Sequence, residues 1–160
     1  LRWIIVGDGR AADEARADVA RRGLEEKVRF LGRFPLERMP SFFTGADALL
    51  VTLRNDPIWS MTIPGKVQSY MASGVPLLAM LDGEGASVIR EADAGLVGPA
   101  SDAVALAANV QALMCMAPEE RRRLGANARR YGASEFNRST LVDRLEHWID
   151  ELDGERDGLR

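Results

Sequence analysis

Short apolar segments and amphipathic segments alternate five times between residues 2 and 97, and this alternation constrains the fold more than any other feature of the chain. Each short apolar run predicts a strand, and each amphipathic pattern between two runs predicts a helix. The predicted strands are 2–6, 28–31, 48–53, 76–81 and 95–97. Because the connections are short, this order is typical of a parallel sheet wrapped by helices. The sequence therefore predicts an α/β fold with an open, Rossmann-like sheet of about five strands.

After residue 97 the pattern becomes helical throughout. Two stripes of apolar residues recur there at helical spacing, which indicates amphipathic helices. The stripes are Leu106, Val110, Leu113 and Met114, then Leu141, Leu145, Trp148, Ile149 and Leu152. We expect one domain over residues 1–152 and a polar, frayed tail over residues 153–160.

Composition and charge exclude several classes of protein. A net charge of −3 gives no general electrostatic attraction to nucleic acid or to an anionic membrane. Cys115 and His147 are the only residues of their kinds, so a disulfide framework, a Cys- or His-rich metal site and a Ser–His nucleophile would be incomplete. No apolar run reaches the roughly 18 residues that cross a bilayer, and no signal peptide is visible. We expect a cytoplasmic protein with no metal and no nucleic-acid partner.

The predicted helix before the fourth strand begins with Pro64, Gly65 and Lys66. Proline suits the first turn of a helix, because the N–H that it lacks would be unpaired there. The N–H groups of Gly65, Lys66 and Val67 are then expected to face a ligand, and no acidic residue in the first turn neutralises them. Such a helix start favours a phosphate or diphosphate. The alternative is an ordinary surface lysine on an ordinary helix.

Two further loops follow predicted strands, where ligands bind in open α/β folds. Residues 7–12 read G-D-G-R-A-A, which fits a dinucleotide-binding turn in which Gly7 and Gly9 would let a phosphate approach. An acid is expected after the second strand in an NAD site; Arg33 stands there instead and could meet the 2′-phosphate of NADP. A plain glycine turn explains the motif equally well. The acidic pair in residues 82–84 could bind sugar hydroxyls, transfer a proton or cap the next helix.

Several segments, in this order, resemble the nucleotide-sugar half of retaining GT-B glycosyltransferases of family GT4. They are residues 5–9, 28–35, 46–51, 63–76, 82–84 and 89–97. The stretch I-P-G-K-V-Q-S-Y-M-A-S-G-V-P at residues 63–76 is similar to one in the branch of N-acetylfucosamine-type transferases of O-antigen and capsule synthesis. The resemblance covers roughly residues 1–150. It implies the C-terminal, donor-binding domain of a two-domain enzyme.

The resemblance implies roles at matching positions, all toward a nucleotide-sugar donor. The backbone around Arg33 and Phe34 would meet the nucleobase. The segment from Thr62 to Lys66, with Gly65, would meet the diphosphate, and Ser69 would lie near the ribose. Asp82, Gly83 and Glu84 would lie near the donor sugar. The donor is a substrate, with UDP as the base expected from the branch, and no separate cofactor is implied.

The chain departs from the family pattern in two ways. The family's E-x7-E motif would place acids at positions 61 and 69, where this chain has Met61 and Ser69. The N-terminal acceptor domain and the first strand of the donor domain lie outside the match. Without that strand the sheet would either be interrupted or close up in the order 2-1-3-4-5. We expect the isolated chain to be inactive, with its catalytic residues unassigned.

Three functions follow from these observations. The first is donor binding in a retaining transfer of a sugar to a cell-surface polysaccharide, with a lipid-linked acceptor and peripheral attachment to the inner face of the membrane as further expectations. The second is an NAD(P)-binding domain of an oxidoreductase, which depends on residues 7–12. The third is a non-catalytic, degenerate GT-B module, suggested by Met61 and Ser69.

Overall fold

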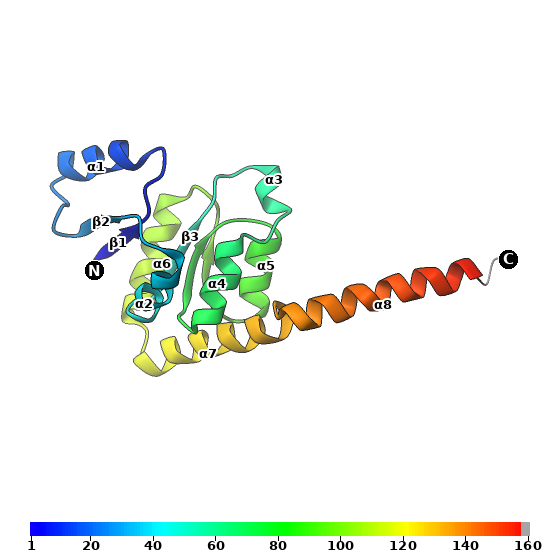
Figure 1. Cartoon of the computed structure of the whole chain (residues 1–160). Coiled ribbons are helices and arrows are strands. Elements are labelled where there is room, and N and C mark those ends of the chain that lie inside the picture. Colours follow the sequence, from blue (N-terminus) through cyan, green and yellow to red (C-terminus); the bar gives the residue numbers. More distant parts are fainter. Residues whose placement is uncertain (158–160) are drawn as a thin grey trace. The chain divides into compact units, whose positions relative to one another are not determined.

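The computed structural model describes residues 1–157 and confirms the α/β class (Figure 1). The chain divides into two compact units, Leu1–Phe42 and Phe43–Arg160. The five predicted strands all form, and they are parallel within two sheets, of two and three strands.

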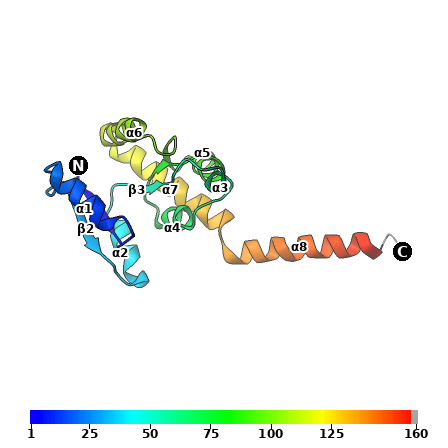
Figure 2. The same ribbon diagram turned by 90° about the horizontal axis from the view of Figure 1, so that it is seen from above.

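Unit 1 is a strand pair with one covering helix. Its elements are β1 (Trp3–Val6), α1 (Ala12–Arg21), β2 (Val28–Gly32), the short helix η1 (Leu36–Arg38) and α2 (Met39–Thr44), which continues into unit 2. Helix α1 lies over the parallel β1–β2 pair (Figures 1 and 2), and the Arg16 guanidinium is 5.0 Å from the centre of the Phe30 ring. Gly7 ends β1 with φ of 133°, a conformation that glycine adopts without strain.

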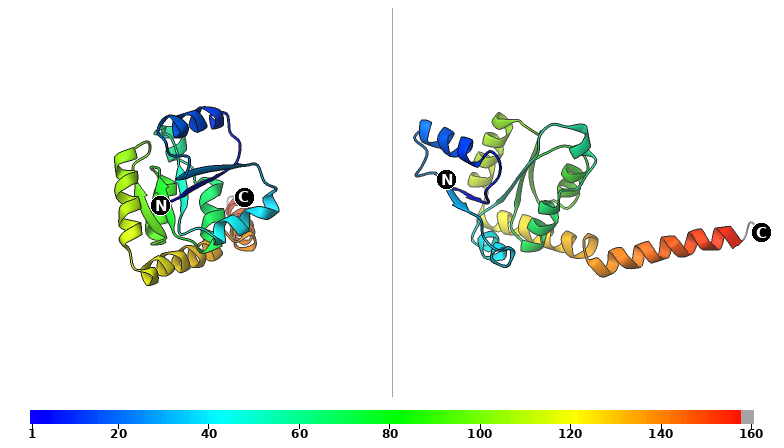
Figure 3. Two further views of the ribbon diagram at one scale, coloured as in Figure 1. Left: turned by 90° about the vertical axis from the view of Figure 1, so that its left-hand side faces the viewer. Right: turned by 45° about the horizontal axis from the view of Figure 1, so that its top comes forward.

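Unit 2 contains the larger sheet and the hydrophobic core. Its elements are β3 (Leu49–Thr52), α3 (Pro57–Ser60), α4 (Gly65–Ser73), β4 (Leu77–Met80), α5 (Glu84–Glu91), β5 (Gly95–Gly98), α6 (Ala103–Cys115), α7 (Pro118–Glu135) and α8 (Arg138–Asp157). The strand order is β3-β4-β5. Helices α4 and α5 cover one face and α6 the other (Figure 3). All four residues of the central strand β4 are buried, as a strand covered on both faces requires.

Helix α4 is fixed in the core by residues one turn apart. Val67 and Met71 are both fully buried and belong to the main core cluster. The helix ends at Gly74, whose left-handed φ of 75° stops it. Gly125 of α7 approaches this end so closely that a Cβ there would overlap the carbonyl oxygen of Gly74. The core contacts of α4 and the contact of its C-terminal end with α7 fix the whole helix, so its N-terminal end is also held in place.

The segment after β5 is helical, as predicted, but its two apolar stripes differ. Val110 and Leu113 of the first stripe are buried, whereas Met114 is 56% exposed. The whole second stripe on α8 is exposed, because within the described residues no element packs along this helix and α7 makes only a small contact with it. Helix α8 continues to Asp157, beyond the start of the tail predicted at residue 153; residues 158–160 lie outside the described residues.

No helix within residues 1–157 is long and apolar enough to cross a membrane.

Candidate functional site

The start of α4 presents backbone donors to solvent. Pro64 precedes the helix with extended backbone, and no side chain caps it. No acceptor is recorded among the described residues for the N–H groups of Gly65 or Lys66, and both residues are exposed. No acidic residue lies in the first turn, which confirms the sequence prediction. This end of the helix therefore keeps its positive partial charge available to an anion.

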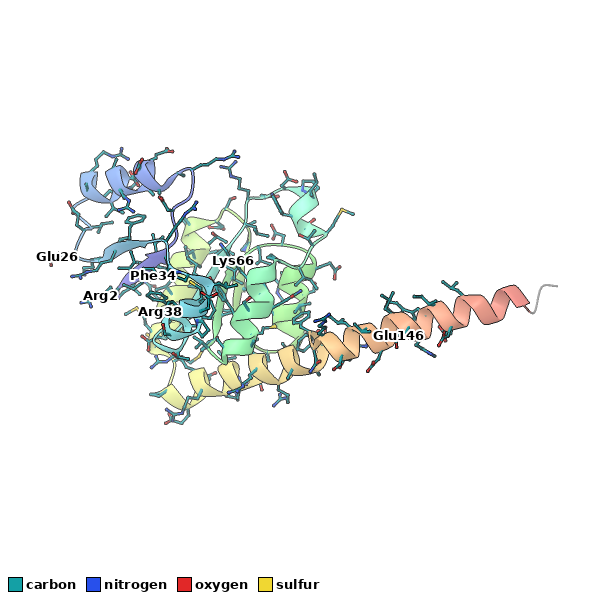
Figure 4. All side chains as sticks on the ribbon, in the orientation of Figure 1. Arg2, Glu26, Phe34, Arg38, Lys66 and Glu146 are labelled. Atoms are coloured by element: carbon teal, nitrogen blue, oxygen red, sulfur yellow. The ribbon has the colours of Figure 1, made fainter. Side chains whose placement is uncertain are left out.

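One predicted donor is not available. The N–H of Val67 donates to the carbonyl oxygen of Pro64 at 2.8 Å, which tightens the first turn. The prediction that Val67 faces a ligand is therefore wrong, because its side chain is fully buried and its amide is paired within the turn. Lys66 instead supplies an exposed ammonium group at the same end of the helix (Figure 4), and it has no ion-pair partner among the side chains of residues 1–152.

Thr62 and Ser69 are placed by local hydrogen bonds. The hydroxyl of Thr62 donates to the Trp59 carbonyl at 3.1 Å, at the end of α3. The hydroxyl of Ser69 donates to the Gly65 carbonyl at 3.2 Å, one turn back along α4. Both side chains are exposed and keep their oxygen lone pairs free to accept from a ligand.

The two acidic residues of the loop after β4, Asp82 and Glu84, have different surroundings. Asp82 does not cap α5, because its Oδ2 accepts from the backbone N–H of Ala100 at 3.2 Å. Gly83 has φ of 70°, and a Cβ there would overlap the carbonyl oxygen of Ser60, so this loop and the α3 segment touch through backbone. Glu84 is exposed in the first turn of α5, where a carboxylate is favoured by the helix dipole.

A pocket of about 310 Å³ opens beside this loop, at the carboxyl ends of β3 and β4. Its lining consists of Leu53, Arg54, Asn55, Asp56, Pro57, Trp59, Ser60 and Asp82. The size is within the range of small-molecule sites. Asp56 begins α3 by accepting from the Ile58 N–H at 2.8 Å, and Trp59 is 48% exposed. A polar loop was predicted over this segment, and neither Arg54 nor Asn55 was predicted as a site residue; the Asp-Pro pair at 56–57 was the available signal of a helix start.

Four predicted residues lie together in unit 1. The backbone N–H of Gly7 donates to the Gly32 carbonyl at 2.8 Å, which joins the loops that follow β1 and β2. Arg33 donates to the Asp8 carbonyl at 3.5 Å, beside Gly9. Phe34 packs edge-on against Phe42, with ring centres 4.8 Å apart. Gly7, Gly9, Arg33 and Phe34 thus form one group, and the residues from Thr62 to Glu84 form another within unit 2.

Few charged groups contribute to the electrostatics of α4. Burial raises the pKa of the phenol of Tyr70 on α4, so it stays protonated at neutral pH, and the ring packs edge-on against Phe43 of α2. Among the side chains that the structure describes, residues 1–152, no group of three or more His, Cys, Asp or Glu is placed to hold a metal ion. The charge available at the start of α4 is therefore that of the helix end and of Lys66.

The fold is shared with solved glycosyltransferase structures. HepE of Anabaena, in complex with UDP, matches with a TM-score of 0.81 and 18% identity, over 94% of this chain and 41% of that one. Sucrose-phosphate synthase of Thermosynechococcus elongatus matches with 0.77 and 23%, over 95% and 38%. A glycosyltransferase of Rickettsia africae matches with 0.75 and 15%, over 95% and 40%. The chain therefore spans about two-fifths of the length of these structures.

No curated protein sequence matches the chain. A family model does: residues 1–115 match the model described as "Glycosyl transferases group 1". The fold is that of the C-terminal, Rossmann-like half of a GT-B enzyme with a helical end. Since the family model covers more than half of the chain, the protein belongs to the glycosyl transferases group 1 family.

Proposed function

We propose that this chain is the donor-binding part of a glycosyltransferase that uses a UDP-sugar. The observation that carries the proposal is the start of α4, where the free N–H groups of Gly65 and Lys66 lie at the same end of the helix as the exposed Lys66 side chain. A diphosphate fits that end by charge and by hydrogen bonding. The similarity to HepE, whose structures are described as complexes with UDP and with UDP-glucose, supports the choice of nucleotide.

The site also suggests how the reaction is assisted. Negative charge grows on the leaving diphosphate as the bond to the sugar breaks, and prepositioned donors stabilise such charge. Lys66 and the helix start would do this without any cofactor. Asp82, Glu84 and the pocket beside them would hold the sugar, while Ser69 would lie near the ribose. Arg33 and Phe34 would meet the base.

The finer parts of the proposal concern the whole enzyme. We propose membership of GT4, retention of the anomeric configuration and transfer to a cell-surface polysaccharide acceptor, for which an acceptor domain and a lipid-linked acceptor are needed. WaaG, described as a glycosyltransferase involved in lipopolysaccharide biosynthesis, is among the similar structures and supports this direction. The cytoplasm, including the inner face of the membrane, is the proposed location. The isolated chain is then expected to bind donor without turning it over.

A ligand panel tests the class of nucleotide. UDP is expected to raise the thermal stability of the chain, by about 2.7 kcal/mol at a hundredfold excess over its Kd. NADP is expected to leave the melting temperature unchanged at the same concentration. Stabilisation by NADP and not by UDP would support the oxidoreductase alternative and contradict the donor site. Differential scanning fluorimetry followed by calorimetry measures both.

Gly65 offers a sharper test, because neither close packing nor backbone conformation requires a glycine at this position. A Cβ at Gly65 meets no atom within 4 Å, and its φ is not left-handed. Gly65→Ala is therefore expected to leave the melting temperature unchanged and to lower UDP affinity about tenfold, by crowding the phosphate. Gly9→Ala is the comparison variant, since a Cβ there also meets open space and Gly9 belongs to the alternative phosphate loop. An equal loss of UDP affinity in both variants would contradict the placement of the diphosphate at α4.

A further inference from the structure

Ser101 lies outside the pocket but is hydrogen-bonded to its wall. The pocket is lined by residues that follow β3 and by Asp82, which follows β4, and by no residue that follows β5. Yet Ser101 Oγ, in the loop after β5, accepts from the backbone N–H of Asn55 at 3.3 Å. Its neighbour Ala100 donates its N–H to Asp82 at 3.2 Å. Two adjacent residues thus bind both loops that form the pocket.

The backbone of Ser101 is held in an unusual conformation. Its φ is 62°, in the left-handed region, and within residues 1–157 only Asp93 shares such a φ among residues other than glycine. This conformation is unfavourable for most residues; glycine adopts it freely, and asparagine and aspartate adopt it more easily than other L-residues. A glycine would fit the turn with less strain, but it would provide no hydroxyl for Asn55. The strain is therefore balanced by a contact that needs this side chain.

The loop after β4 completes the connection. Because a Cβ at Gly83 would overlap the Ser60 carbonyl, the loop 82–83 already touches Ser60 of the pocket lining through backbone. The hydrogen bonds from Ala100 to Asp82 and from Asn55 to Ser101 then link the loops after β3, β4 and β5 around one cavity. Movement at Ser101 would reach Arg54 and Asp56 through Asn55, their neighbour in sequence.

We propose that Ser101 is a positioning residue that fixes the width of the pocket and thereby selects the sugar of the donor. The inference rests on the proposed function, because the sugar is assigned to this pocket by it. The hydrogen bond of Ser101 goes to Asn55, beside the pocket, and not to α4, where the diphosphate is proposed to bind. It should therefore affect binding of the sugar more than binding of UDP.

Three substitutions at this position separate positioning from stability. Ser101→Gly removes the acceptor and relieves the left-handed strain, so the melting temperature should hold or rise. Ser101→Ala removes the acceptor and keeps the strain. Ser101→Asn tolerates the same φ and restores an oxygen acceptor. The matched control is Asp93→Gly, which relaxes the other left-handed residue, whose side-chain partners Arg123 and Asn127 lie on α7.

Calorimetry with UDP-glucose and UDP as probes gives the first readout. Ser101→Gly and Ser101→Ala are expected to lower UDP-glucose affinity about fivefold, the value of one hydrogen bond, and to leave UDP affinity within about twofold. Ser101→Asn should recover most of the loss, and Asp93→Gly should change neither affinity. Equal changes in both affinities, or no change at all, would overturn the inference.

Hydrogen exchange of the unliganded chain gives a second readout that needs no ligand. The amides of residues 53–60 are expected to exchange faster in Ser101→Gly and Ser101→Ala than in the natural chain, and not in Ser101→Asn or Asp93→Gly. Faster exchange without UDP binding to the natural chain would contradict the proposed function but uphold the contact between the loops. UDP binding with unchanged exchange and unchanged sugar affinity in every Ser101 variant would overturn the inference alone.

Discussion

Gly125→Ala is expected to destabilise the protein by about 3 kcal/mol or more, the largest effect that we predict for a single methyl group. The reason is the contact between α7 and the end of α4, where a Cβ at position 125 would overlap the Gly74 carbonyl and also approach Pro76 Cδ, at 3.5 Å. Backbone cannot rotate out of the way as a side chain can. The helices must therefore separate, which exposes the buried Met71 and Val67.

Gly132→Ala, on the same helix, is the matched control. A Cβ there lies 3.2 Å from the Met71 Cβ, so the two helices need to move apart by only a few tenths of an ångström. Alanine also gains about 1 kcal/mol of helix propensity over glycine, so the net change should be near zero. Urea unfolding of both variants measures the difference. If Gly125→Ala and Gly132→Ala unfold at the same urea concentration, the close approach of α4 and α7 is not as the structure has it.

Lys66→Ala is expected to lower UDP affinity about tenfold, because it removes a charged donor from the diphosphate while the helix start remains. The side chain is exposed and unpaired within the described part of the chain, so stability should not change. The lost interaction is electrostatic and partly screened. The affinity of the natural chain should therefore fall more steeply with added salt than that of Lys66→Ala.

The chain contains one other lysine, which provides the control. Lys27 is exposed in unit 1 and follows α1, outside every predicted site. Lys27→Ala makes the same change in net charge, so it should reproduce any general electrostatic effect and none of the specific one. Calorimetry at two salt concentrations measures all three proteins. Unchanged affinity in Lys66→Ala would remove Lys66 from the proposed diphosphate site.

Most of the fold could be predicted because its signals are local. The central strand was expected at 76–81 and forms over Leu77–Met80, and the helix expected at 64–73 forms over Gly65–Ser73. A continuous apolar run and a glycine stop report on their own segments without reference to the rest of the chain. The short helix α3 was missed, since four residues carry too little periodicity to distinguish them from a polar loop.

The candidate site could be predicted only where its chemistry belongs to one segment. The helix start at Pro64, Gly65 and Lys66 is visible from the residues alone, and the structure leaves its first two N–H groups free. The function of Asp82 was left open between capping and ligand binding; the structure instead ties its carboxylate to Ala100, 18 residues away. No local pattern could reveal that partner.

The sequence by itself therefore determined the alternation of strands and helices, the parallel sheet order within each unit and the positive end of α4. These follow from periodicity and from backbone groups that every helix start leaves unpaired. Only the tertiary structure decided the pocket, the backbone contact of Gly83 with Ser60 and the position of Ser101 against Asn55. The physical reason is distance along the chain: close packing joins loops 23 to 46 residues apart (Ser60 with Gly83, Asn55 with Ser101), and hydrogen bonds between them depend on the positions of whole strands.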